Sequence, residues 1–476
     1  MRRSLLCMLL APSVASAQAA FDRSKAPVLP PAPKLMLPAV VTARLASGMA
    51  VQVVAQRELP LVQVTLAVAG GSRLDGAEPG LATFMARMLA ESAGGRDVNT
   101  LQNALASLGA NLNANASWDG VFVSLNVPKR SLGAALDLMA DVVQRPAFTS
   151  ADVRRQKSLR AASILQRRDQ PNALASLAFN TILFPAGHPY HNPADGDSAS
   201  TARLDSASVR SFYERSFLPA RAKFIVAGDI TAPEAIALLG ARFGEWKAAA
   251  SPLTMPAVTV QPVINVSTKV FLIDKPGAAQ SVISIGAPGV ARSSPDYAAL
   301  VVMNTLLGES FSSRLNSNLR ETKGYTYGIG SRFAWQPVPG AFRISSGVRT
   351  DVTDSSLVEI FRELRRIQQT PANAVELGRA KAYVALAVPG NFETIGEIVS
   401  ELVTLDTFGL PLSSVSQFIA RVNAVTAADV QRVAKKYLPA GNATVVVVGD
   451  LAKVRAGIDA LQLGPSTVLD VSTIAK

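Results

Sequence analysis

The histidines are the first side chains to test for chemistry, because imidazole serves both as a metal ligand and as a general base. The chain holds two, His188 and His191, spaced as His-x-x-His and followed by Asp195 and Asp197. Two imidazoles and two carboxylates are a conceivable ligand set for zinc. The histidines are flanked by Gly187, Pro189 and Pro193, however, and these residues favour a turn with hydrogen-bonded imidazoles. We expect the turn, and no structural or catalytic zinc in this chain.

Cysteine chemistry depends on one residue, Cys7, which lies in an N-terminal segment typical of a signal peptide. Two arginines precede an apolar stretch at 5–14, and Ala-Ser-Ala at 15–17 provides the small residues of a cleavage site. We expect residues 1–17 to be removed without lipid attachment, and the mature chain to act in the bacterial periplasm. A mature chain without cysteine excludes disulfides, thiolate nucleophiles and cysteine-ligated metal.

The composition indicates a folded, basic protein. Hydrophobic residues make up 49% and charged residues 17% of the 476 positions, which excludes a disordered chain. The formal charge is +12, and removal of Arg2 and Arg3 would leave +10. No run of five basic residues and no interleaving of basic with aromatic residues occurs, so we expect no nucleic-acid partner. After the N-terminal segment, no apolar run approaches the ~20 residues of a membrane span, so we expect none.

The chain is predicted to contain two copies of one α+β domain. Phe-Leu-Pro-Ala at 217–220 corresponds to Tyr-Leu-Pro-Ala at 437–440, and each block follows an amphipathic helix. Each also precedes a buried strand that ends in Gly-Asp, and the offsets are 220 and 221 residues. We divide the chain into a signal peptide (1–17), a Pro-rich arm (18–40), a first domain (41–247), an Ala/Pro-rich linker (248–266), a second domain (267–465) and a tail (466–476).

Three groups of short motifs give the chain a family resemblance. They are Gly-Ser-Arg-Leu-Asp at 71–75 with Gly-Leu-Ala at 80–82, His-Pro-Tyr at 188–190, and Leu-Arg-Glu-Thr-Lys-Gly at 319–324 with Tyr-Gly at 327–328. Together with the repeat, they resemble the pitrilysin (insulinase-type) zinc peptidases, which are inverzincins. The resemblance covers nearly the whole mature chain. It implies two tandem homologous domains of the LuxS/pitrilysin-like type, each an antiparallel-rich sheet covered by helices.

The zinc-binding residues of that family are missing here. Active members carry His-x-x-Glu-His directly after the Gly-Leu-Ala run, with two histidine ligands and a glutamate as general base. This chain has Thr83, Ala86 and Arg87 at those positions. The family's third ligand is a glutamate on a later helix, and no glutamate occurs between Glu91 and Glu214. Threonine is a poor zinc ligand, alanine has no base, and the arginine cation repels a metal ion. We expect a partner subunit to hold zinc instead.

The resemblance assigns chemistry to Arg320 and Tyr327. Active relatives supply an arginine and a tyrosine from the second domain with the spacing of seven found here. The tyrosine hydroxyl can donate to the oxyanion at the scissile carbonyl, and the arginine can hold a substrate carbonyl or support the tyrosine. Gly324 allows the helix between them to end, and Tyr325 is the alternative tyrosine on the same strand face. Without the resemblance, the spacing alone favours a surface arginine and a core tyrosine.

A substrate-binding strand is implied as well. Residues 109–117 and 121–125 read as two adjacent strands, and they resemble the family's edge strand, to which substrate adds as an extra β-strand. We assign peptide binding to Asn113, Ala114, Asn115 and Ala116, because the small alanines would leave that edge open. An ordinary hairpin with Asn-rich strand ends is the alternative interpretation.

These observations predict a zinc-less subunit of a heteromeric periplasmic peptidase. It would be inactive alone and would supply Arg320 and Tyr327 in trans to a zinc-bearing relative, with which it hydrolyses peptides as a heterodimer. The alternative is a non-catalytic peptide-binding or scaffold subunit, in which replacing either residue changes no turnover. A third hypothesis is an autonomous enzyme with another, unrecognised site.

Overall fold

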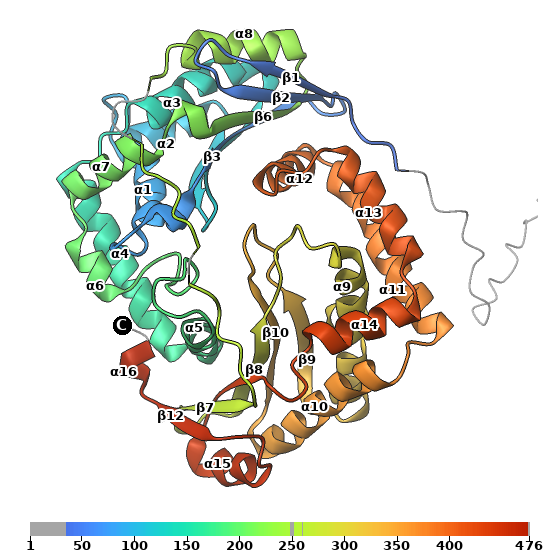
Figure 1. Cartoon of the computed structure of the whole chain (residues 1–476). Coiled ribbons are helices and arrows are strands. Elements are labelled where there is room, and N and C mark those ends of the chain that lie inside the picture. The colour runs from blue at the N-terminus through green and yellow to red at the C-terminus, as the bar shows by residue number, and fades with distance from the viewer. Residues whose placement is uncertain (1–34, 248–251, 259, 475–476) are drawn as a thin grey trace, which may run out of the picture. The chain divides into compact units, whose positions relative to one another are not determined.

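The computed structural model describes residues 35–247, 252–258 and 260–474 (Figure 1). The predicted signal peptide (1–17) and residues 18–34 of the Pro-rich arm lie outside these residues. From Met36 onward the described residues form one unit by their contacts. Within the described ranges, no helix has both the length and the apolar character needed to cross a membrane.

The first half of the chain forms a six-stranded sheet in the order β1-β2-β6-β3-β5-β4. The pair β2–β6 is parallel, and all other neighbouring pairs are antiparallel. The strand β4 therefore forms one edge of this sheet, as the sequence analysis expects. The strands are β1 (Val40–Arg44), β2 (Ala50–Ala55), β3 (Leu61–Ala69), β4 (Asn111–Ala116), β5 (Gly120–Pro128) and β6 (Ala222–Gly228).

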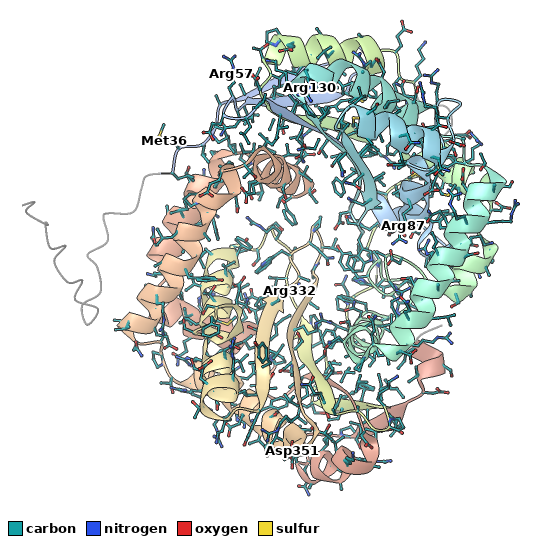
Figure 2. The ribbon with its side chains drawn as sticks, turned by 180° about the vertical axis from the view of Figure 1, so that it is seen from behind. Met36, Arg57, Arg87, Arg130, Arg332 and Asp351 are labelled. Atoms are coloured by element: carbon teal, nitrogen blue, oxygen red, sulfur yellow. The ribbon has the colours of Figure 1, made fainter. Side chains whose placement is uncertain are left out.

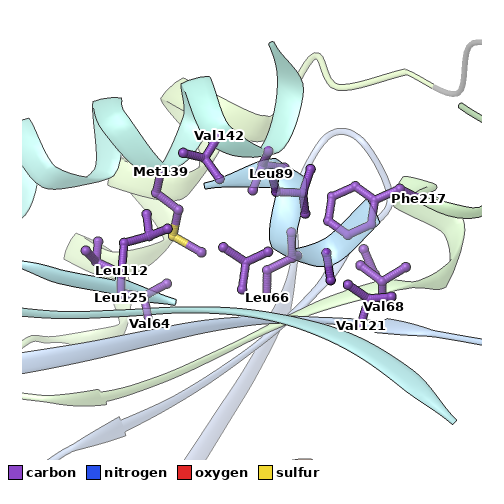
Figure 3. Close-up of a cluster of buried hydrophobic side chains, with 14 of the residues drawn as sticks. Val64, Leu66, Val68, Leu89, Leu112, Val121, Leu125, Met139, Val142 and Phe217 are labelled. Atoms are coloured by element: carbon purple, nitrogen blue, oxygen red, sulfur yellow. The ribbon is translucent and has the colours of Figure 1, made fainter. Parts of the chain in front are cut away.

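The core of this half follows from the alternation of side chains along its strands. Val64, Leu66 and Val68 of β3 point to one face of the sheet and are buried. Val121 and Leu125 of β5 lie on the same face (Figure 3). Two helices pack on this face and close the core, α1 (Leu81–Leu89) and α3 (Leu132–Gln144).

The second half forms another six-stranded sheet, in the order β12-β7-β11-β8-β10-β9. Five neighbouring strands correspond between the two sheets. In order, the second sheet has β7, β11, β8, β10 and β9 where the first has β2, β6, β3, β5 and β4. The repeated sequence blocks fall on α7 (Ser206–Ser216) before β6 and on α14 (Ala427–Tyr437) before β11. This match confirms two α+β halves of one design. The strands are β7 (Lys269–Asp274), β8 (Gln280–Pro288), β9 (Thr326–Phe333), β10 (Ala341–Arg349), β11 (Thr444–Gly449) and β12 (Ser466–Leu469).

The strand β12 differs from the sequence expectation, which placed residues 466–476 in a tail after the second domain. Residues 466–469 instead pair with β7 in parallel and complete the second sheet. They take the place that β1 has in the first sheet, where the pairing with β2 is antiparallel. The short helix α16 (Val471–Ile474) then packs on α5, a helix of the first half.

The two halves exchange one helix each. The helix α5 (Pro171–Leu183) packs on β11 and β8 of the second sheet, whereas α12 (Ile395–Thr407) packs on β6 and β3 of the first (Figure 1). An ion pair between Lys223 of β6 and Asp406 of α12 accompanies the second contact. The main sheet contacts of each inserted helix are thus with strands in the middle of a sheet.

The other helices surround these layers, and the predicted linker has neither helix nor strand in its described residues, 252–258 and 260–266. Its Val263 amide donates to Leu183 O of α5 at 2.8 Å. The remaining helices are α2 (Val98–Ser107), α4 (Ser150–Asp169), α6 (Ser198–Arg203), α8 (Ala232–Phe243), α9 (Tyr297–Asn304), α10 (Thr353–Gln369), α11 (Ala374–Ala387), α13 (Ser413–Ala424) and α15 (Leu451–Ala460).

Candidate functional site

Helix α1, which carries the positions of the family's zinc motif, is held at its N-terminus by the half-buried carboxylate of Asp75. Asp75 accepts hydrogen bonds from the amides of Gly80 at 2.7 Å and Ala82 at 2.8 Å. Gly80 has φ 85°, a left-handed conformation that suits glycine at the start of the helix. Burial raises the pKa of Asp75 to about 7, against the opposing effect of these amides and of the Arg160 cation.

The three predicted motif residues lie on α1 but do not form a metal site. The Thr83 hydroxyl lies 2.9 Å from Gly80 O and 3.0 Å from Ala194 O, so its single hydrogen is directed to main-chain carbonyls. Ala86 is buried and has no donor atom. Arg87 (Figure 2) points to Asp195, 3.8 Å away, and its side chain is half exposed.

A buried arginine from α4 lies beside these residues. Arg160 is 3% exposed and donates to Gly80 O at 2.9 Å and to the Thr83 hydroxyl at 3.1 Å. Its guanidinium also lies 5.6 Å from the centre of the Phe84 ring. Burial lowers the pKa of Arg160 to about 10, so it stays a cation at neutral pH. A fixed positive charge in contact with Thr83, the first position of the motif, does not fit a zinc site.

Arg160 is a residue that the sequence analysis missed. The sequence analysis notes only that no glutamate occurs between Glu91 and Glu214, a range that includes this arginine. A local signal exists, because Val153, Arg160 and Ile164 are spaced by seven and four residues and share one face of α4. An arginine in an apolar stripe indicates a buried, partnered cation.

The two histidines form the hydrogen-bonded turn that the sequence favours. His188 is 3% exposed, and its Nδ1 accepts from the Tyr190 amide at 3.1 Å. The Nδ1 of His191 lies 2.6 Å from Phe184 O. Burial, and next the neighbouring His191, lower the pKa of His188 to about 4. Across the described ranges, no group of three or more His, Cys, Asp or Glu side chains lies close enough to hold a metal ion.

Arg320 and Tyr327 are brought together on the surface of the second half. Arg320 lies on the π-helical turn Asn316–Thr322, and Tyr327 lies at the start of β9. The guanidinium carbon is 5.4 Å from the centre of the Tyr327 ring and 4.4 Å from that of Phe311. Tyr327 is 89% exposed, so the interpretation of a core tyrosine is wrong.

The surroundings of the pair refine the sequence hypothesis. Phe311 is 64% exposed. The sequence analysis did not single it out, because its spacing from Tyr327 follows no regular period. Arg320 also lies 3.3 Å from Glu321. Tyr325, the alternative tyrosine, precedes β9 and is half-buried, with its amide donating to Leu319 O at 2.8 Å. Of the two tyrosines, Tyr327 is therefore the accessible one.

The edge strand β4 has the arrangement that peptide addition requires. Within the described residues, its main chain pairs on one side with β5, and no main-chain hydrogen bond to the opposite side is found. Asn113 and Asn115 are exposed, whereas Ala114 and Ala116 are half-buried against the first core. The asparagines, rather than the alanines, thus face solvent beside the open edge.

Comparison with known proteins places this arrangement in context. A family model described as Insulinase (Peptidase family M16) matches residues 52–183, and one described as Peptidase M16 inactive domain matches residues 203–384. A solved structure described as the peptidase M16 inactive domain from Pseudomonas fluorescens is similar with a TM-score of 0.79 and 27% identity, over 86% of this chain and 98% of that chain.

Two curated relatives extend the comparison. An uncharacterised zinc protease of Mycobacterium leprae is 30% identical over 280 residues, which is 58% of this chain and 62% of that protein. The mitochondrial-processing peptidase subunit beta of Lentinula edodes is 22% identical over 418 residues, which is 83% of this chain and 86% of that protein. The match thus spans less than two thirds of the mycobacterial relative.

The fold and these matches first define a class, proteins built from two pitrilysin-like α+β domains in tandem. Within that class, the chain belongs to the insulinase-type (M16) peptidase family. Both the family and the LuxS/pitrilysin-like fold agree with the sequence-based resemblance. The chain departs from active members of the family at α1, where threonine, alanine and arginine occupy the zinc motif.

Proposed function

We propose that this chain is a zinc-less subunit of a two-chain periplasmic peptidase, and that it supplies Arg320 and Tyr327 in trans to a related, zinc-bearing subunit. The main supporting observation is the exposure of Tyr327 beside Arg320, while the Arg160 cation contacts Thr83, the first position of the missing zinc motif. The name of the Lentinula edodes relative, a subunit of a processing peptidase, supports assembly with another chain.

The chemistry proposed for this chain is stabilisation of negative charge. The Tyr327 hydroxyl donates to the carbonyl oxygen of a scissile peptide bond as charge develops on it. The Arg320 cation lies over the ring face, restrains the ring and adds a favourable field for the oxyanion. Because Tyr327 projects into solvent, an acceptor held by another chain can reach it. The metal chemistry belongs to the partner.

Substrate is proposed to bind along β4. An extended peptide would hydrogen-bond to the free main-chain groups beside Asn113 and Asn115, as strands do in β-augmentation. Main-chain pairing recognises an extended conformation rather than one sequence, so the substrates would be short or unfolded peptides.

The test begins with the tagged chain, purified from native periplasmic extract with its partner. We expect a histidine-containing chain of similar size, zinc in the complex and peptidase activity. Tyr327→Phe should lower kcat by ~10²–10³-fold, the typical cost of one oxyanion donor, and leave the complex assembled. Tyr383→Phe, a half-exposed tyrosine of α11, is the matched control and should change nothing. A chain that purifies alone, or a complex indifferent to Tyr327→Phe, would contradict the proposal.

Export is proposed from the N-terminal sequence alone. Fractionation should recover the protein in the periplasm, and mass spectrometry should give a mature chain that starts at Gln18. Recovery with the initiator methionine in the cytoplasm would contradict it.

A second candidate function is a peptide-binding subunit without a part in the chemistry. The open edge of β4 favours it, since that edge needs no catalytic residue to bind an extended peptide. In that case both Arg320→Ala and Tyr327→Phe would leave turnover unchanged in the complex, while peptide binding by this chain would persist.

A further inference from the structure

Two arginines face each other across β9 and β10 without a carboxylate between them. Arg332 of β9 is directly opposite Arg343 of β10, so both side chains lie on the same face of the second sheet. Like charges in this position destabilise a sheet. Arg343 donates to the Ser176 hydroxyl at 2.9 Å, and both burial and Arg332 lower its pKa. Arg332 is exposed and has no hydrogen bond or ion pair among the described residues.

Arg332 lines a cavity of about 670 Å³ that lies between the two halves. Its walls are the turn after β4, the turn between β9 and β10, and the helices α12 and α13. Figure 2 shows Arg332 in the middle of the molecule, near the end of β9. The aromatic side chains of the lining are Trp118, Phe122, Tyr297, Phe333, Trp335, Phe408 and Phe418. The cavity thus has several aromatic side chains in its lining and the Arg332 cation at its wall.

The carboxylates of this cavity do not neutralise Arg332. Asp119 pairs with Arg73 at 3.4 Å, and Glu401 accepts from the Asn391 amide nitrogen at 2.9 Å. Burial raises the pKa of both acids, which disfavours their charged forms. The other cation of the lining, Arg292, stacks on the Tyr297 ring at 3.4 Å from its centre. Both acids of the lining are thus engaged by other groups, and Arg332 is left without an anionic partner among the described residues.

We propose that this cavity binds a peptide carboxylate, with Arg332 as its direct partner and Arg343 as the supporting charge. The planar guanidinium donates two parallel hydrogen bonds to a carboxylate, and the aromatic walls accept the adjoining apolar side chain. The cavity lining begins at Ser117, the residue after the open strand β4, so a peptide that passes the end of β4 meets it. The choice of a peptide rests on the proposed function; the binding itself is a property of this chain alone.

The experiment uses the intrinsic fluorescence of the full chain without its partner. Two of the three tryptophans, Trp118 and Trp335, line the cavity, while Trp246 is buried in the first core. The probe is an N-acetylated pentapeptide without acidic side chains that ends in phenylalanine with a free carboxylate. We expect saturable quenching, and a binding constant that weakens as salt is added.

Matched variants test the assignment of Arg332. Arg332→Gln should weaken binding about tenfold to a hundredfold, the usual effect of losing hydrogen bonds to a charged group. Arg332→Lys keeps the positive charge but not the planar guanidinium that can donate two parallel hydrogen bonds, so it should weaken peptide binding less than Arg332→Gln does. Arg130→Gln removes one charge from an exposed arginine in the turn after β5 and should leave binding unchanged (Figure 2). Equal binding by the Arg332→Gln and Arg130→Gln proteins would overturn the proposal.

Two further peptides distinguish the sources of the carboxylate. The same pentapeptide with a C-terminal amide should not bind if a chain terminus is recognised, whereas an amide with one internal glutamate should bind if an acidic side chain suffices. Binding of the uncharged amide as tight as that of the free acid would refute carboxylate recognition. Because no partner is present, this result is independent of whether Tyr327 acts in trans.

Discussion

The two edge strands β4 and β9 hold the same place in matching sheets, yet they present opposite surfaces. The outer main chain of β4 is free among the described residues. That of β9 is covered by two buried amides: Asn316 bonds to both the amide and the carbonyl of Ile329, and Asn304 donates to Ser331 O. The first domain thus has an edge strand whose main chain is free to bind another strand. In the second domain the main chain of the edge strand is already hydrogen-bonded, and its side chains are accessible instead.

The comparison extends to the helices that support these edges. In the first half, the buried polar centre beneath α1 contains the Arg160 cation. In the second half, α9 supplies the neutral amide of Asn304, which also accepts from the Ser331 hydroxyl at 2.8 Å. A duplicated fold can therefore diverge without changing its strand order, because the buried polar groups beside the edge decide what remains accessible.

The largest effect is expected from Arg160, on which the first half depends. Arg160→Met should lower the free energy of unfolding by about 3 kcal/mol, because it leaves two buried acceptors and the carboxyl of Asp75 without their cation. Urea unfolding measures this. Arg154→Met, at an exposed position on the same helix, is the control and should cost less than about 0.5 kcal/mol. Equal effects would mean that Arg160 is not a structural cation.

The histidine turn of the first half should make stability depend on pH. The pKa of His188 is lowered to about 4 in the folded state, so between pH 4 and the ordinary value of 6.5 the unfolded chain binds more protons. Stability is thus complete above pH 6.5 and is lost as the pH falls toward 4, by at most about 3 kcal/mol. Unfolding curves at pH 7 and 5 test this. His188→Gln should reduce the acid loss, and His191→Gln should retain it; the reverse pattern would contradict the assignment.

Opening the covered edge is the direct test of the contrast between β4 and β9. Asn316→Ala removes the bonds to Ile329 and should cost about 1–3 kcal/mol, with faster hydrogen exchange at the Ile329 amide. Asn113→Ala, at the exposed position on β4, should cost less than about 0.5 kcal/mol. If both changes cost the same, the two edges do not differ as described.

The smallest effect is expected at Phe311. Phe311→Leu removes one of the two rings that hold Arg320 and should weaken that restraint by about 0.5–1 kcal/mol. In the purified complex the peptidase kcat should fall a few-fold, with unfolding unchanged. An exposed phenylalanine that serves only as a partner contact would instead alter assembly and leave kcat intact.

The sequence indicated much of this molecule before any tertiary information. Residues 217–228 and 437–449 repeat one local pattern, and local patterns predict the two α+β halves. The motif positions Thr83, Ala86 and Arg87 and the spacing of Arg320 and Tyr327 are equally local, so they could be identified from the resemblance. The strand that contains Asn113 to Ala116 is likewise a local feature, and its place at the edge of the sheet followed from the resemblance.

Other features depended on contacts between distant residues. Periodicity tells which face of a helix is apolar but not what covers it, so the exchange of α5 and α12 between the halves was not predictable. Three further features likewise join segments that are distant in the sequence. They are the contact between Arg160 and Thr83, the register that places Arg332 opposite Arg343, and the pairing of β12 with β7. The sequence thus determined the elements and the missing zinc motif, while the tertiary structure decided which edge, which charge and which aromatic side chains are accessible.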